Sequence, residues 1–312
     1  MGRDEPARQA DLFAVPTTVP KITPIKRRIL DAAVEIMDDQ APLERVDYMH
    51  AALCQVGIPR RAVGARVFER QSGAISLRLE AGSLYRRGQW VEQQLPYGAK
   101  PRLVLLHICG EAVRMRSRRV DVGGSMRAFL RTLGIDTSGG AKGGYTAFRK
   151  QMEALAACRL SLGQHFNDHD ITINTMPISR FDAWSPAADD EQRGWPGYME
   201  LSQDFFDSLS DRAVPLDHTA IAALKHSALA LDIYTWLAHR LRRVGNPAGT
   251  RLSWTNLREQ FGQEYADAKN FKREFRAALT QVLVVYPDAR VETITGGLLL
   301  RESPPPIASR LR

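Results

Sequence analysis

The sequence has little cysteine and lacks the motifs that mark common catalytic and nucleotide sites. Its three cysteines, Cys54, Cys109 and Cys158, are far apart, and no CxxC pair occurs. Neither a zinc site nor a disulfide framework is therefore indicated. A GxxxxGK[ST] phosphate loop and a serine nucleophile elbow are also missing. We therefore expect reduced core cysteines, no cofactor and no enzymatic activity.

Long apolar runs are missing as well. No stretch approaches the roughly 18 apolar residues that a membrane span requires. The first residues lack the apolar segment of a secretory signal. The sequence predicts a cytoplasmic protein that has no membrane partner.

Two polar clusters are candidate metal sites. A relaxase or rolling-circle nuclease would need a metal-binding His-x-His motif, whereas His165 and His169 are four residues apart, at an expected strand end and turn. The acidic run at residues 189–191 has the composition of a solvated turn. We expect no metal at either place, which disfavours a nuclease.

Basic residues are in excess. The chain has 312 residues with 43 Lys and Arg against 35 Asp and Glu, a net charge of +8. This balance favours a polyanionic partner, nucleic acid before an anionic membrane. The length allows two domains, each with its own core.

Residues 267–288 form the most informative stretch. At 100° per residue, Lys269, Lys272, Arg273 and Arg276 fall on one arc of a helix. The largely opposite arc carries the apolar residues Phe271, Phe275, Ala278, Leu279 and Val282. Such a helix suits a DNA groove, although a solvated charged face gives the same pattern.

One order of elements occurs twice. Each copy has an apolar helix, a basic cluster, a short helix ending at glycine, a basic amphipathic helix and two strands. The expected ranges in the first copy are 102–115, 125–133, 145–158, 160–166 and 171–176. The ranges in the second copy are 220–243, 255–261, 267–288, 290–294 and 298–301. A helix-turn-helix closed by a two-stranded wing has this order. The sequence thus predicts an α+β protein with tandem winged-helix domains.

The remaining segments complete the expected organisation. Helical spacing occurs at residues 25–38 and 43–56, and strand-like alternation at 67–95. Arg60, Arg61 and Arg66 form a basic cluster that we expect to be exposed. The predicted divisions are a flexible tail at 1–23, the first winged-helix domain at 24–179, a connector at 180–215, the second winged-helix domain at 216–302 and a flexible tail at 303–312.

Eleven cations are the candidate contacts to double-stranded DNA. Those on the second basic helix are Lys269, Lys272, Arg273 and Arg276, and those of the first copy are Lys142, Arg149 and Lys150. The basic clusters add Arg118, Arg119, Arg242 and Arg243 as phosphate contacts. Lys and Arg that neutralise phosphates give affinity, while side chains in the groove select bases.

The N-terminal tail contains a short apolar motif. Gln9-Ala10-Asp11-Leu12-Phe13 resembles the pentapeptide QL[SD]LF with which many bacterial replication proteins bind the sliding clamp. In that resemblance Gln9 occupies a polar subsite, and Leu12 and Phe13 fill a hydrophobic pocket. Ala10 replaces the usual Leu. The alternative is a tail segment that lies on its own domain.

Several motifs resemble the plasmid RepA-type replication initiators. They are the segment 96–102, the glycine-rich stretch 130–151 and the helix segment 230–238, ALDIYTWLA. The resemblance implies a protein that binds repeated origin sequences (iterons), melts adjacent DNA and recruits host proteins, including helicase and sliding clamp. It also implies repression of the protein's own promoter, sometimes as a dimer. No heptad helix is evident, so a homodimer is left open. The alternative function is a transcriptional repressor or partition-type DNA-binding protein.

Overall fold

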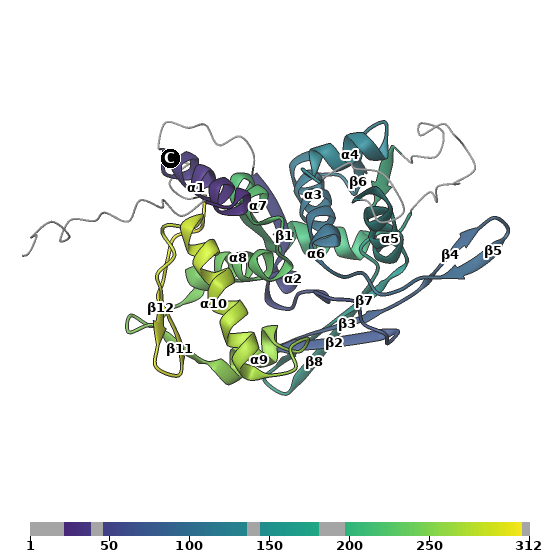
Figure 1. Cartoon of the computed structure of the whole chain (residues 1–312). Coiled ribbons are helices and arrows are strands. Elements are labelled where there is room, and N and C mark those ends of the chain that lie inside the picture. The colour runs from purple at the N-terminus through teal and green to yellow at the C-terminus, as the bar shows by residue number, and fades with distance from the viewer. Residues whose placement is uncertain (1–21, 39–45, 136–143, 181–196, 308–312) are drawn as a thin grey trace, which may run out of the picture.

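The computed structural model describes residues 22–38, 46–135, 144–180 and 197–307 and has a mixed architecture of helices and small antiparallel sheets (Figure 1). Two helices, α3 (Ala99–Met115) and α8 (Ala228–Arg240), are buried along most of their lengths. Because they are apolar on nearly all sides, other elements pack around both. The predicted combination of helices and strands is confirmed.

The second half contains the predicted basic helix in a compact unit. After α8 follow β11 (Thr250–Ser253), α9 (Trp254–Phe261), α10 (Ala268–Val284), β12 (Val291–Ile294) and β13 (Gly297–Leu300). Strand β13 pairs with both β12 and β11. The short helix, the basic helix and the last two strands are confirmed, whereas β11 was not predicted.

A single helix over residues 220–243 is wrong. Helix α7 (His218–Leu224) ends first, and α8 begins after Ser227, whose side chain accepts a hydrogen bond from the Ala230 N–H at 3.2 Å. This serine cap starts a new helix inside an apolar stretch. A short 3-10 helix, η1 (Leu241–Arg243), follows α8.

The first half repeats the element order with a different sheet. Its elements are α3, β6 (Arg119–Asp121), α4 (Met126–Thr132), α5 (Gly144–Ala157), β7 (Arg159–Phe166) and β8 (His169–Thr175). Strand β6 pairs with β9 (Tyr198–Glu200). Strands β7 and β8 instead extend β2 (Val67–Ser72) and β3 (Ile75–Glu80) into a four-stranded sheet, β2-β3-β7-β8. The two halves thus share element order but not strand pairing.

Segments from the N-terminal part pack on the second half. Helix α1 (Pro24–Met37) contacts α7 and α10, and β1 (Val46–His50) pairs with β10 (Ala213–Asp217). The helix predicted over 43–56 is wrong, because its described part is β1 followed by the short helix α2 (Ala51–Gln55). Pairing with a distant strand overrides the local helical spacing. Helix α6 (Gln203–Arg212) leads directly into β10.

Candidate nucleic-acid interface

Helix α10 has one buried side and one cationic side. Asp267 caps it by accepting a hydrogen bond from the Asn270 N–H at 2.7 Å. The predicted apolar residues are buried, with Phe275 fully enclosed. On the other side Lys269, Arg273 and Arg276 are exposed, and Lys272 is half-buried. A rigid helix therefore presents a row of cations to solvent.

The Trp254 indole orders two cations of that row. The ring centroid lies 5.1 Å from the Lys272 Nζ and 5.2 Å from the Arg276 guanidinium carbon. Its edge contacts the Phe275 ring at a centroid distance of 5.9 Å. Cations over an aromatic face are attracted by the ring quadrupole. Trp254 was not among the predicted site residues, because its contacts depend on tertiary packing.

The turn between β12 and β13 lies beside the same tryptophan. The backbone N–H of Trp254 donates to the Gly296 carbonyl at 3.0 Å. Gly296 has φ +89°, which favours glycine, and a Cβ at Gly297 would lie 1.8 Å from the Leu252 carbonyl oxygen. The glycine pair thus allows the turn to approach the first residues of α9.

Arg273 extends beyond the tryptophan. Its Nη2 donates to the Asn270 Oδ1 at 2.6 Å and to the Glu274 Oε1 at 3.0 Å, and its side chain is 74% exposed. Both partners lie on α10. These bonds hold the guanidinium on the outer surface, where it can exchange the Glu274 contact for a phosphate or a base edge.

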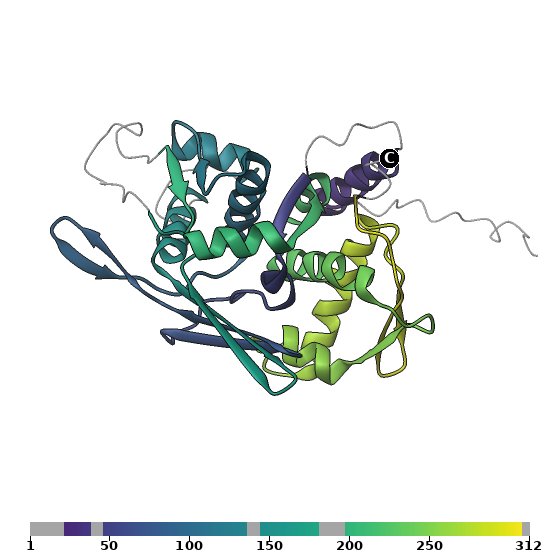
Figure 2. The same ribbon diagram turned by 180° about the vertical axis from the view of Figure 1, so that it is seen from behind.

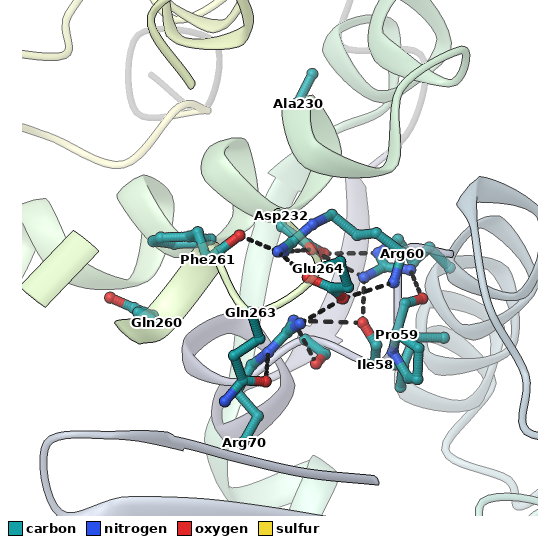
Figure 3. Close-up of polar contacts among 12 residues, drawn as sticks. Ile58, Pro59, Arg60, Arg70, Ala230, Asp232, Gln260, Phe261, Gln263 and Glu264 are labelled. Carbon is teal, nitrogen blue, oxygen red and sulfur yellow. Dashed lines mark hydrogen bonds and ion pairs between the residues drawn. The ribbon is translucent and has the colours of Figure 1, made fainter. Parts of the chain in front are cut away.

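An ion cluster in the interior joins Arg60, Arg70, Asp232 and Glu264 (Figure 3), and Arg102 completes it through Asp232. The Asp232 carboxylate accepts bonds from Arg102 at 2.6 and 2.8 Å and from Arg60 at 3.0 Å. Glu264 accepts from Arg60 at 2.7 Å and from Arg70 at 2.6 Å. The cluster connects α3, α8 and the segment around residue 60 with the turn before α10.

Electrostatics keep both acids of the ion cluster ionised. Burial alone would raise the pKa of Asp232, but Arg102, Arg60 and Arg70 outweigh it and hold that pKa below its usual value. Burial likewise opposes ionisation of Glu264, and Arg60 and Arg70 lower its pKa. Burial and the neighbouring Arg60 lower the pKa of Arg70 to about 10. Three cations thus surround two carboxylates in the interior.

The ion cluster fixes the turn between α9 and α10, because Glu264 lies in that turn. Beside it, the Arg61 guanidinium carbon lies 5.3 Å from the Tyr265 ring centroid, and the Tyr265 ring lies 5.6 Å from that of Phe271. The expectation that Arg60 is exposed is wrong, since its side chain is only 5% exposed. An isolated Asp232 in the apolar run of α8 is the sequence signal for such a partner.

The first-half candidates lie elsewhere. Lys150 is exposed on α5, and the Arg149 Nε lies 3.7 Å from the Glu153 Oε1. Lys142 lies outside the described residues. Figures 1 and 2 place α5 and α10 on opposite sides of the molecule, so the structure does not bring the two basic helices together.

The other four cations also lie away from the α10 row. Arg118 pairs with Glu200 at 2.8 Å, and Arg119 stacks on Tyr198 at 3.8 Å, both across the β6–β9 pair. Arg242 and Arg243 line a cleft of about 1380 Å³ that is bounded by α6, η1, α9 and the β2-β3-β7-β8 sheet. No residue of α10 lines this cleft. The tail residues Gln9, Leu12 and Phe13 lie outside the described part of the chain.

The His165 imidazole has an acidic partner rather than a cluster of ligands. Its Nδ1 lies 2.7 Å from the Asp170 Oδ1. Over the described ranges, no group of three or more His, Cys, Asp or Glu residues is placed to hold a metal ion. Residues 189–191 fall outside those ranges. Among the described helices, none is long and apolar enough to cross a membrane.

A cationic helix that is braced by a shorter helix and flanked by a β-hairpin is typical of sequence-specific DNA-binding proteins. Residues 95–257 match the family model described as "Plasmid encoded RepA protein". The match spans more than half of the chain, which therefore belongs to this family of plasmid replication initiators.

No curated protein matches the sequence. Among solved structures, the chain is similar to the "Crystal structure of SeMet derivatives of domain2 and domain 3 of RctB", with 12% identity and a TM-score of 0.48, over 77% of this chain and 88% of that chain.

Proposed function

We propose that this initiator binds repeated origin sequences (iterons) as duplex DNA, with the first turns of α10 in the major groove. The observation that carries the proposal is the position of Lys272 and Arg276 against the ring of Trp254, whose backbone N–H is hydrogen-bonded to Gly296 in the hairpin turn. In this arrangement Lys269 and Arg273 reach base edges, and Lys272 and Arg276 neutralise phosphates.

The fold that we propose for the DNA-binding units is the winged helix. In the second unit, residues 216–302, β13 pairs with β11 and β12, and the β12–β13 hairpin is the wing. The first unit, residues 24–179, uses Lys142, Arg149 and Lys150 on or before α5. Residues 180–215 connect the units, and Arg118, Arg119, Arg242 and Arg243 contact phosphates outside the grooves.

The later steps of initiation follow from the same proposal. The bound protein opens the adjacent duplex and recruits host helicase and sliding clamp, the latter through Gln9, Leu12 and Phe13. It also represses its own promoter, as a monomer or a homodimer. It carries out these steps in the cytoplasm without a cofactor and without an enzymatic reaction of its own.

A plasmid test and a footprint examine this function together. A plasmid that contains only this gene and its flanking repeats should replicate in a host that lacks other copies of the gene. Purified protein should protect those repeats with a spacing that reflects one or two engaged units. Protection without replication would reduce the function to repression, and failure of both would reject the proposal.

A further inference from the structure

A two-stranded hairpin carries an exposed aromatic pair far from α10. Strands β4 (Ser83–Arg86) and β5 (Gln89–Glu92) project from the body of the molecule (Figures 1 and 2). Tyr85 and Trp90 lie directly opposite each other in the strand register, with ring centroids 5.4 Å apart. Tyr85 is 59% exposed and Trp90 is 71% exposed. Both rings thus face solvent on one side of the hairpin.

The hairpin is seated firmly against α5. A Cβ at Gly82 would lie 2.0 Å from the Ala157 carbonyl oxygen, so glycine permits contact between the two backbones. The Arg86 Nη2 lies 2.7 Å from the Glu153 Oε1 of α5. These two contacts join the hairpin to α5 at Gly82 and at Arg86.

The charges around the aromatic pair favour a polyanion. Glu92 pairs with Arg66 at 2.9 Å, and Glu153 pairs with Arg86. Both nearby carboxylates are thus matched by arginines. Arg87 at the hairpin turn is exposed and carries no ion pair within the part of the chain that the structure describes. Aromatic faces beside an unmatched cation suit nucleic acid better than an apolar protein surface.

We propose that the β4–β5 hairpin binds single-stranded DNA, with unpaired bases stacked on Tyr85 and Trp90 and phosphates near Arg87. A duplex covers its base faces by internal stacking, whereas an opened strand exposes them. The inference rests on the proposed function, because origin opening supplies the single strand. The hairpin would then retain the strand that opening releases.

The test uses the full chain and a fluorescently labelled oligothymidylate, followed by anisotropy. Trp90→Ala and Tyr85→Ala should each weaken binding by about 5- to 150-fold, the range for losing one stacked base. Trp90→Phe should retain most of the affinity, because a phenyl ring still stacks. Binding to duplex repeats should be unchanged in all three variants.

Several results would overturn the inference. Wild-type protein that does not bind the oligonucleotide, or alanine variants that bind it normally, would each reject it. An equal loss of duplex affinity in the alanine variants would show that the hairpin contacts duplex DNA. A sedimentation coefficient that differs between these variants and the wild type would show that the hairpin is a protein interface. The double variant Lys272→Ala/Arg276→Ala separates the two proposals, because it should weaken binding to duplex repeats and leave binding to the oligonucleotide unchanged. If this variant binds duplex repeats normally, the result counts against the role of α10 and not against the hairpin.

Discussion

At the scale of single residues, Trp254 connects the parts of the candidate interface. It follows the N-cap Ser253, packs on Phe275 and holds Lys272 and Arg276 against its ring. Freely rotating lysine and arginine side chains lose conformational entropy when they bind a phosphate. A ring that orders them beforehand reduces this loss, so under the proposed function we expect the indole to increase DNA affinity without touching DNA.

Replacing this ring tests its role. Trp254→Ala should weaken duplex binding by up to about 1–3 kcal/mol, because each of the two side chains that the ring no longer orders loses roughly 0.5–1.5 kcal/mol of conformational freedom on binding. Trp254→Phe should retain more affinity, since a smaller aromatic face remains. Titrations of duplex repeats at constant salt measure both effects. Equal affinity of the alanine variant and the wild type would show that the ring does not order the cations.

The acids of the ion cluster predict sensitivity to low pH. The pKa values of Asp232 and Glu264 are lowered below their ordinary values of 3.8 and 4.5. Their ionised forms therefore stabilise the fold above those values, and this contribution is lost as the pH falls through the lower folded values. Urea unfolding across the acid range should show a decrease in the free energy of unfolding that begins below about pH 4.5.

Asp232→Asn identifies the source of that sensitivity. The substitution leaves Arg102 without its buried counter-charge and Arg60 with Glu264 alone, and we expect a loss of about 3–5 kcal/mol at neutral pH. It should also flatten the acid dependence. Glu259→Gln, an exposed acid on α9, is the matched control and should unfold like the wild type. Neutral-pH stability equal to the wild type in Asp232→Asn would contradict the assigned role.

At the scale of elements, the long periodic segments and the hairpin strands β12 and β13 were predictable, whereas several other short strands were not. Apolar spacing located α5 within one residue of both observed ends and α10 within one residue of its start, although α10 ends at Val284, four residues before the predicted stretch does. Strands β6, β10 and β11 have only three to five residues, too few to show an alternating pattern. Their pairing depends on partners that are distant in sequence. The same dependence turned residues 46–50 from an expected helix into β1.

The β11–β13 pairing is an element that a single substitution can test. Gly297→Ala would place a Cβ 1.8 Å from the Leu252 backbone oxygen, a contact that no side-chain rotation relieves. We expect a loss of about 1–3 kcal/mol in the free energy of unfolding, together with weaker duplex binding. Gly245→Ala is the control, because no atom lies within 4 Å of its Cβ position. Identical urea midpoints for the two variants would contradict this packing argument.

At the scale of the whole molecule, the two halves are joined by more than the chain itself. The β1–β10 pair, the packing of α1 on α7 and the ion cluster each connect segments far apart in sequence. None of these connections was predicted from local patterns. Two of these connections reach α10: Glu264 of the ion cluster lies in the turn before α10, and α1 contacts α10 directly.

The salt dependence of duplex binding tests the central claim most directly. Wild-type protein, Lys272→Ala/Arg276→Ala and the charge-matched control Arg66→Ala/Arg78→Ala should be titrated with duplex repeats over a series of salt concentrations. Arg66 and Arg78 are exposed and paired with Glu92 and Glu80. The α10 variant should lose affinity, and its log–log slope should fall by about 0.9 for each phosphate contact removed. The control should keep the wild-type slope. The same slope in all three proteins would show that α10 does not contact the DNA backbone.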